Sequence, residues 1–139
     1  MKSVLFLLIA LVSLNTSFSQ KYKSHYDNGQ LKEKGKLKDG KKVGIWEAFH
    51  ENSELFSFGE YVYGLKMGEW IYNSAAGHKD SIVNYASGKK NGSWISFYSN
   101  ESMKDSGGYK FSDDKIDVWK SFFENGNLKL VGEYSILGN

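Results

Sequence analysis

Gly68-Glu69-Trp70 is the stretch that decides the fold. The same order of glycine, free position and tryptophan recurs at Gly44-Ile45-Trp46 and Gly92-Ser93-Trp94, so these three tryptophans are spaced 24 residues apart. The fourth tryptophan, Trp119, follows 25 residues after the third. A fixed spacing of roughly 20–50 residues is the sequence signature of repeat architectures. The spacing therefore predicts one structural unit repeated along the chain.

Each unit has the pattern of a β-hairpin. In the first unit, Asn28-Gly29 and Asp39-Gly40 are dipeptides typical of tight turns. Between them, Leu31, Glu33, Gly35 and Leu37 alternate with lysines, which is the period of two expected of a half-buried strand. The second strand of the unit carries its tryptophan. One unit is therefore predicted to be a strand, a turn, a strand and another turn.

Aligning the tryptophans divides the chain into units at about 26–49, 50–73, 74–97 and 98–122, with a partial fifth at 123–139. We predict an all-β fold, an elongated open antiparallel meander of repeated β-hairpins with about nine or ten short strands. Two irregularities are expected. Val83 replaces a glycine in the third unit. In the fourth, the segment Ser112 to Asp117 lacks the usual turn glycines and has one extra residue, so we expect a longer or distorted hairpin.

A glycine recurs in the middle of the first strand of most units, and glycine inside a strand costs roughly 0.5–1 kcal/mol relative to alanine. Its recurrence therefore requires a compensating contact. We expect the ring of a tryptophan or tyrosine on the neighbouring strand to cover the bare backbone. The structural positions of the repeat are then Gly35, Gly44, Trp46, Gly59, Gly68, Trp70, Gly92, Trp94, Gly107, Trp119 and Gly132.

Residues 1–19 differ in composition from the rest of the chain. Met1-Lys2-Ser3 gives a positive start, Val4 to Val12 is apolar, and Ser17-Phe18-Ser19 has the pattern that signal peptidase recognises. We expect cleavage after this triplet, which leaves a repeat domain at 20–139 that is periplasmic or secreted. The alternative, a retained anchor, is disfavoured because the apolar run is shorter than the ~20 residues that span a bilayer. Cysteine is absent, so neither a lipoprotein nor disulfide bonds are expected.

The charge of the domain does not favour a nucleic-acid partner. Without Lys2, 17 lysines face 16 acidic residues, which gives a net charge of +1. All basic residues are lysines, so the chain lacks the arginine fork that reads phosphates and base edges bidentately. We therefore expect no nucleic-acid binding.

The pattern Tyr26-Asp27-Asn28-Gly29-Gln30-Leu31, followed by Gly35, Gly40, Gly44 and Trp46, resembles the MORN repeat in its bacterial variant. The resemblance extends over nearly all of the chain after the leader. It implies an elongated, twisted antiparallel sheet of successive hairpins. Some family members resemble antitoxins of the YwqK type, and eukaryotic relatives are associated with membranes, phospholipids or protein scaffolds. The resemblance does not specify a ligand.

No constellation of residues indicates catalysis. His25, His50 and His78 lie at different places in the repeat, without cysteines or paired carboxylates at ligand spacing, so neither a zinc site nor a histidine-based triad is predicted. The serines lack the context of a nucleophile elbow, and the glycine-rich turns close hairpins rather than cradle phosphate. We expect no catalytic residue, no cofactor and no metal, and hydrolysis of a cell-envelope polymer is disfavoured.

The one acidic cluster is Asp113, Asp114 and Asp117. Carboxylates at this density could hold Ca²⁺ weakly in an exported protein. The cluster lacks the EF-hand register and its bidentate glutamate. We interpret it as a solvated turn.

Two surfaces are candidates for binding. The lysines of the hairpin turns, which a regular array would align along one edge of the sheet, could contact an anionic membrane surface or simply keep the sheet soluble; they are Lys41, Lys42, Lys66, Lys89 and Lys90. Phe49, Phe97 and Phe122 follow a tryptophan by three residues and are expected on the opposite face of the sheet, where they either pack or form a strip for a protein partner.

These features together predict an exported, non-catalytic scaffold that binds a protein through the face of its sheet. The alternatives are association with an anionic membrane through the lysine turns, or an antitoxin-like neutralising role. The oligomeric state and the identity of the partner stay open.

Overall fold

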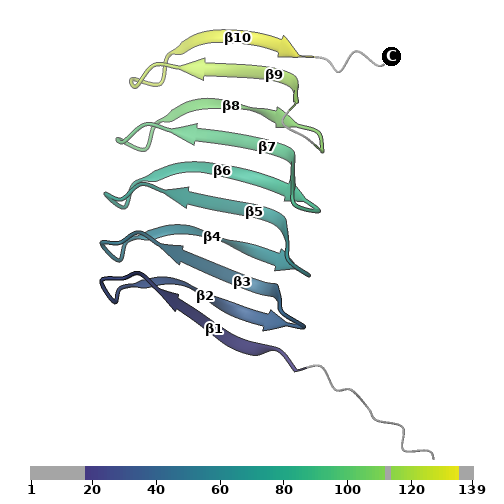
Figure 1. Cartoon of the computed structure of the whole chain (residues 1–139). Coiled ribbons are helices and arrows are strands. Elements are labelled where there is room, and N and C mark those ends of the chain that lie inside the picture. The colour runs from purple at the N-terminus through teal and green to yellow at the C-terminus, as the bar shows by residue number, and fades with distance from the viewer. Residues whose placement is uncertain (1–17, 112–113, 135–139) are drawn as a thin grey trace, which may run out of the picture.

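The part of the chain that the structure describes, residues 18–111 and 114–134, forms one antiparallel sheet in a computed structural model (Figure 1). Most of the expected leader lies outside these residues. Ten strands follow one another in both sequence and space. They are β1 (Gln20–His25), β2 (Leu31–Lys38), β3 (Lys41–Phe49), β4 (Leu55–Val62), β5 (Leu65–Asn73), β6 (Lys79–Ala86), β7 (Lys89–Phe97), β8 (Met103–Tyr109), β9 (Lys115–Phe122) and β10 (Leu128–Tyr134).

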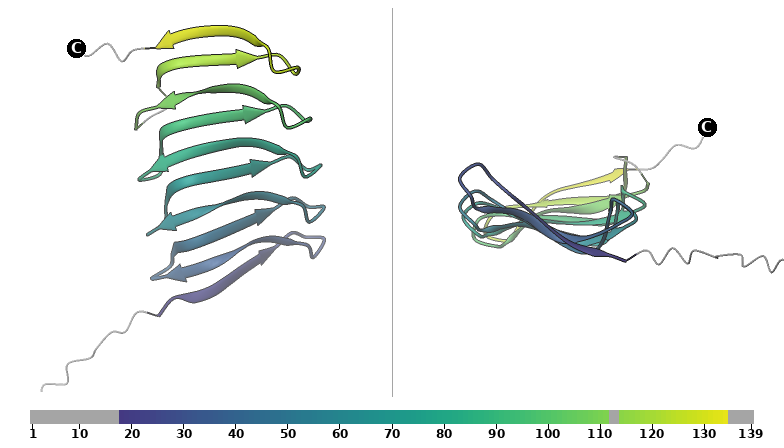
Figure 2. Two further views of the ribbon diagram at one scale, coloured as in Figure 1. Left: turned by 180° about the vertical axis from the view of Figure 1, so that it is seen from behind. Right: turned by 60° about the horizontal axis from the view of Figure 1, so that its bottom comes forward.

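The predicted all-β meander is confirmed. Each strand pairs antiparallel with its neighbours in sequence, and in Figure 1 the described residues form a single layer without a second sheet or helix packed on it. Seen more nearly along the stack in Figure 2, the strands at the two ends cross in projection, as expected from the twist of a β-sheet. Residues 18–111 and 114–134 contain no helix long and apolar enough to cross a membrane.

The strand β1 precedes the first of the predicted units. In the register of β1 with β2, Tyr22 lies opposite Gly35, just as Trp46 lies opposite Gly59 in the next pair of strands. The ring of Tyr22 also contacts that of Trp46, with 5.5 Å between the centroids. Tyr22 therefore takes the place of a tryptophan in a half unit at the start of the array.

The turns within units are two-residue hairpin loops at Asp39-Gly40, Tyr63-Gly64 and Ser87-Gly88. Both residues of each loop have positive φ, for example 51° at Asp39 and 73° at Gly40. Such loops match the twist of the strands that they join. Successive units are also joined at the opposite edge, where the hydroxyl of Tyr26 donates to the carbonyl of Phe49 at 2.7 Å.

The Gly-x-Trp motif forms a β-bulge. Between β2 and β3 the register passes from Lys34 opposite Glu47 to Lys36 opposite Val43, so that Gly35 alone faces three residues of β3. The first of these three, Gly44, has a φ of 67°, a conformation that glycine adopts without steric cost. Because of this bulge, the tryptophan at the end of the motif can fold back across the strand beside it.

The irregular fourth unit keeps this bulge without the glycine. Asp117 lies two residues before Trp119 and has a φ of 61°, so it takes the place of Gly44. The connection from β8 to β9 has five residues, 110–114, against two in the other within-unit turns, and its positions 112–113 lie outside the described residues. The expected longer hairpin is therefore found, and the sheet beyond it stays regular.

Replacing Asp117 with glycine should stabilise the protein. Left-handed backbone costs an L-residue about 1–2 kcal/mol, less for aspartate, so we expect Asp117→Gly to gain about 0.5–1 kcal/mol in urea unfolding. Ile116→Gly is the control, because Ile116 is not among the residues with positive φ and the change should destabilise. A loss of stability in Asp117→Gly would show that the carboxylate, rather than the backbone, maintains the bulge.

The tryptophans form a core on one face of the sheet, here called the Trp face. Trp46, Trp70 and Trp119 are 2%, 3% and 9% exposed. A Cβ added to Gly35 or Gly59 would overlap the ring of Trp46 or Trp70, respectively, and Gly107 has the same relation to Trp119. The expected covering of mid-strand glycines is therefore confirmed at these positions. At Gly132, the atoms nearest to such a Cβ belong to Tyr134 of its own strand, at 3.5 Å.

Trp94 departs from this arrangement. Its neighbour on the preceding strand, β6, is Val83, whose side chain occupies the space that a glycine leaves open in other units. Trp94 is only half-buried and stacks on Trp119 instead, with centroids 5.2 Å apart and an interplanar angle of 27°. The loss of one glycine therefore moves one ring toward the next unit.

Lysine side chains form the outer cover of this one-layer core. The Nζ atoms of Lys42, Lys66 and Lys115 lie 4.0, 4.3 and 4.1 Å from the ring centroids of Trp46, Trp70 and Trp119. A lysine can bury its methylene chain on an apolar surface and keep its charge near water, and the ammonium is attracted to the ring face. The lysines thus supply part of the cover that a second layer gives in other folds.

Candidate functional site

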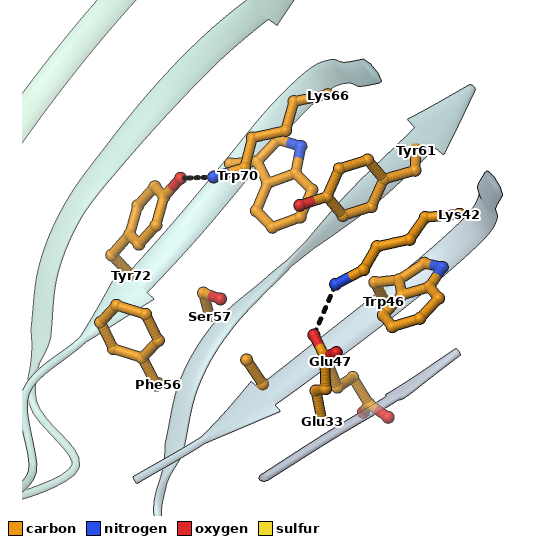
Figure 3. Close-up of a pocket in the computed structure, with 11 residues that line it drawn as sticks. Glu33, Lys42, Trp46, Glu47, Phe56, Ser57, Tyr61, Lys66, Trp70 and Tyr72 are labelled. Carbon is orange, nitrogen blue, oxygen red and sulfur yellow. Dashed lines mark hydrogen bonds and ion pairs between the residues drawn. The ribbon is translucent and has the colours of Figure 1, made fainter. Parts of the chain in front are cut away.

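A cavity of about 200 Å³ opens on the Trp face between Trp46 and Trp70 (Figure 3). Its floor comes from adjacent strands, where Ala48 of β3 lies opposite Ser57 of β4 and Ser57 lies opposite Tyr72 of β5. Cross-strand neighbours on one face lie close enough to act together. The remaining lining residues are Glu33, Lys42, Glu47, Phe56, Tyr61 and Lys66.

Glu33, on the Trp face, and Glu47, which is paired with Phe58 of the back face, both line this cavity and already have cationic partners. Lys42 Nζ lies 2.5 Å from Glu33 Oε2, an ion pair drawn in Figure 3. Lys34 Nζ lies 2.6 Å from Glu47 Oε2. The charges of Lys42, Glu33 and Glu47 are therefore compensated within the protein.

Lys66 is different. Its side chain is half-buried, and its ammonium donates a hydrogen bond to the hydroxyl of Tyr72 at 2.6 Å. No carboxylate of the described residues lies within ion-pair distance of it. Burial lowers the pKa of Lys66, and the charge of Lys42 lowers it further. Lys66 is therefore a partly desolvated cation without a countercharge.

The tyrosines around Lys66 form a short hydrogen-bonded chain. Because Tyr72 accepts from Lys66, its own proton can point toward the hydroxyl of Tyr85, 3.2 Å away. Burial raises the pKa of Tyr72, and the hydrogen bond and charge of Tyr85 and the charge of Tyr61 act in the same direction. Burial also raises the pKa of Tyr61, followed by the charge of Glu33. Both hydroxyls therefore stay protonated to a higher pH than the hydroxyl of an ordinary tyrosine.

These shifts predict a loss of stability in alkali. Above a pH of about 10 the tyrosines ionise in the unfolded chain, while Tyr72 stays protonated in the folded protein, so the folded state binds more protons and the free energy of unfolding falls as the pH rises. In urea unfolding between pH 8.5 and 11, we expect a shallower fall for Tyr72→Phe than for the wild type. Lys66, with its lowered pKa, acts in the opposite sense in both proteins. Parallel curves would contradict the assignment to Tyr72.

Ser57 is the one buried polar residue among those described, at 5% exposure. Its hydroxyl lines the cavity (Figure 3), and none of the described residues forms a hydrogen bond with its Oγ. A buried hydroxyl normally has a hydrogen-bond partner. Ser57 therefore presents an unused donor and acceptor to the cavity.

The expectation that the five turn lysines align along one edge of the sheet is wrong for three of them. Lys42 and Lys66 lie over tryptophan rings on the Trp face, and Lys90 lies half-buried there, 4.8 Å from the ring centroid of Tyr109. Lys41 and Lys89 remain exposed at the start of their strands. At the equivalent place in the second unit the chain has Leu65, which is 50% exposed. The edge of the sheet therefore lacks a continuous row of positive charge.

The expected aromatic strip is also interrupted. Phe49, Phe97 and Phe122 are half-buried, and the equivalent position of the second unit is Asn73, whose amide donates to the carbonyl of Leu55 at 3.1 Å. Lysines lie over two of these rings, with Lys34 Nζ 5.3 Å from the centroid of Phe49 and Lys79 Nζ 5.5 Å from that of Phe97. These phenylalanines therefore do not form an open strip.

A different apolar row lies on the face opposite the tryptophans, here called the back face. Phe58, Ile71, Ile82 and Ile95 are directly paired neighbours on β4, β5, β6 and β7, and they are called the isoleucine strip below. Sequence reasoning missed this strip. The signal was present, because Ile71 and Ile95 each follow a tryptophan and are 24 residues apart, as are Phe58 and Ile82.

Neither the three histidines nor Asp114 and Asp117 line the cavity. His50 Nε2 lies 2.9 Å from the carbonyl oxygen of Asn73, whereas His25 and His78 are exposed. Asp113 of the acidic cluster lies outside the described residues. Within residues 18–111 and 114–134, no group of three or more side chains is arranged to hold a metal ion.

Comparison with known proteins adds nothing to this geometry. No model of a known protein family matches the chain, and no curated protein matches it closely enough to count as a relative.

Proposed function

We propose that the protein is a non-catalytic binding module and that the isoleucine strip on its back face contacts a protein partner. The observation that carries the proposal is the position of this strip. It crosses four adjacent strands near the middle of a sheet on which residues 18–111 and 114–134 form no second layer. Contiguous apolar surface on a soluble protein usually marks an interaction site.

The surroundings of the strip support this proposal. At one end, Phe58 is paired with Glu47, which forms an ion pair with Lys34. At the other end, Ile95 is paired with Ser106, and Ser106 with Lys120. An apolar centre within a polar rim is the usual composition of a protein–protein interface.

The backbone beneath the strip is fixed before any partner arrives. Strands β4 to β7 are each paired on both sides, so hydrogen bonds fix the spacing of the four side chains. A surface that is already ordered loses little conformational entropy on binding. The strip can therefore contribute its apolar area without a large ordering cost.

The test compares partners captured by the wild type with those captured by the double variant Ile71→Thr, Ile82→Thr. Threonine keeps the β-branched shape that favours strands and removes apolar surface. Ile45→Thr is the matched control, because Ile45 lies on the same face outside the strip and is 53% exposed. We expect the double variant alone to lose a cross-linked partner. Identical partners for all three proteins would overturn the proposal, and association between copies of the chain would appear in sedimentation of the purified protein.

Export and the resemblance to MORN repeats remain predictions, and they determine where the partner is sought. An exported domain at 20–139 meets partners in the cell envelope or the medium, so capture should use those fractions. An antitoxin-like role would then require a toxin that is exported as well. Association with membranes is tested by sedimentation with anionic vesicles at low and raised salt, since binding through lysines weakens as salt rises.

A further inference from the structure

We propose that the cavity on the Trp face binds a small monocarboxylic acid, with its carboxylate between the ammonium of Lys66 and the hydroxyl of Ser57. This site lies on the face opposite the isoleucine strip. The proposal therefore does not rest on the proposed protein partner, and each can fail without the other.

The charges around the cavity favour a ligand with a single negative charge. Lys42 is neutralised by Glu33 at 2.5 Å, and Glu47 by Lys34 at 2.6 Å. Lys66 alone among these groups has no carboxylate partner in the described part of the chain. A charge removed from water is costly unless an opposite charge accompanies it. One carboxylate brings the site to neutrality, whereas a phosphate dianion would meet the charge of Glu33.

The donors available in the cavity suit a carboxylate. The ammonium of Lys66 has three hydrogens, and only one is needed for its bond to Tyr72. Ser57 offers a hydroxyl that the protein does not use, and the hydroxyl of Tyr61 points into the same space in Figure 3. Hydrogen bonds between an ammonium and a carboxylate are among the strongest in proteins. The two oxygens of the acid would therefore find separate donors.

The rest of the cavity suits an apolar substituent. Phe56, a residue that is 41% exposed, lines it, and its ring lies 5.9 Å from the ring of Tyr72, centroid to centroid. Ala48 contributes to the floor. A cavity of ~150 Å³ can hold a benzene molecule, so a space of about 200 Å³ admits an acid with one small ring or a short chain.

The residues that shape this cavity differ from their counterparts in other units. Tyr72 lies two positions after its tryptophan, where the other units have Ala48, Ser96 and Ser121. Only the second unit therefore gives its lysine a tyrosine partner from this position. A purely structural lysine cover needs no such partner, as Lys42 and Lys115 show over their own tryptophans.

The test uses benzoate as the probe, with benzamide as its neutral counterpart and inorganic phosphate as the competing anion. The indole Nε1–H groups of Trp46 and Trp70 donate to the carbonyls of Lys36 and Glu60, each at 3.2 Å, and report on the cavity in ¹⁵N-resolved spectra. The indole of Trp119 lies outside the lining of this cavity and serves as the internal reference. We expect benzoate to shift the first two signals saturably, with benzamide and phosphate much weaker.

Two variants locate the binding. Lys66→Met keeps an apolar chain over Trp70 and removes the charge, so it should weaken benzoate at least about tenfold. Lys90→Met is the matched control from the next unit and should bind like the wild type. Ser57→Ala removes a hydroxyl without an internal partner, so it should weaken benzoate severalfold while leaving the melting temperature unchanged or raised.

Several results would overturn the proposal. They are the absence of a saturable shift with benzoate, equal binding of benzamide, tighter binding of phosphate, or unchanged affinity in both Lys66→Met and Ser57→Ala. If Lys66→Met does not fold, Ser57→Ala decides alone, because it keeps every charge of the site.

Discussion

Replacing Trp70 with alanine will lower the free energy of unfolding by about 3–5 kcal/mol, the range for truncation of a buried tryptophan. Trp70 is 3% exposed, covers Gly59, donates its indole N–H to the backbone carbonyl of Glu60 and lies under Lys66. Its removal uncovers bare backbone and leaves a half-buried ammonium without its ring. Since small domains have only ~5–15 kcal/mol of stability, a thermal melt should show a fall of more than about 10 °C.

Trp94→Ala is the matched control for this prediction. Trp94 has the same place in its unit but is half-buried, and the residue beside it on the preceding strand is Val83 rather than a glycine. We expect it to cost roughly half as much or less, because less apolar surface is lost. Equal costs for the two tryptophans would show that the covering of glycine does not explain the stability of the array.

The second large effect is expected from Gly59→Val. Any Cβ at this position overlaps the ring of Trp70, so the ring must leave its place over β4. We expect a loss of about 3 kcal/mol, the upper part of the usual range for overpacked cores. A red shift of tryptophan emission should accompany it, as the ring moves into water. Urea unfolding followed by fluorescence measures both.

Gly132→Val separates this clash from a general effect of valine. Gly132 is also a mid-strand glycine, but the nearest atoms to an added Cβ are 3.5 Å away, which is ordinary contact. Valine favours strands, so we expect no loss of stability, or a small gain. A large loss at Gly132 would mean that glycine is needed at these positions for a reason other than the ring.

The architecture followed from the sequence because its causes are local and repeated. The spacing of Trp46, Trp70 and Trp94, with glycine two residues before each, is sufficient to predict the hairpins, whereas the bulges were found only in the structure. The alternation of side chains along the strands also indicates the face on which the lysines lie. Lys42 and Lys66 precede a tryptophan by four residues, an even number, which places both side chains on the Trp face. The expectation that these lysines lie at the edge of the sheet was based on their position next to the turns. It did not take into account the even number of residues between each lysine and its tryptophan.

The cavity could not be predicted in the same way. It depends on which residues of separate strands become neighbours, such as Ser57 opposite Tyr72, and on the direction in which long side chains point. The pairing of Lys42 with Glu33 rather than with another acid is equally a property of the folded sheet. The departure of Trp94 toward Trp119 follows from Val83 in the sequence, but its direction required the structure.

That departure divides the ring contacts of the Trp face into two series. Ring contacts run continuously from Tyr22 through Trp46 and Tyr61 to Trp70 and Tyr85. A second series joins Trp94, Trp119, Tyr109 and Tyr134. Among the described residues no ring contact joins the two series. Strands β6 and β7 are held together by their backbone ladder, by aliphatic contacts and by the hydrogen bonds that the Asn84 amide donates to Ser93. In a protein whose elements contact only their neighbours, local opening spreads until it meets a weak junction. We expect the hairpin of β6 and β7 to be such a junction, so that the C-terminal hairpins can open while the cavity and most of the isoleucine strip stay folded.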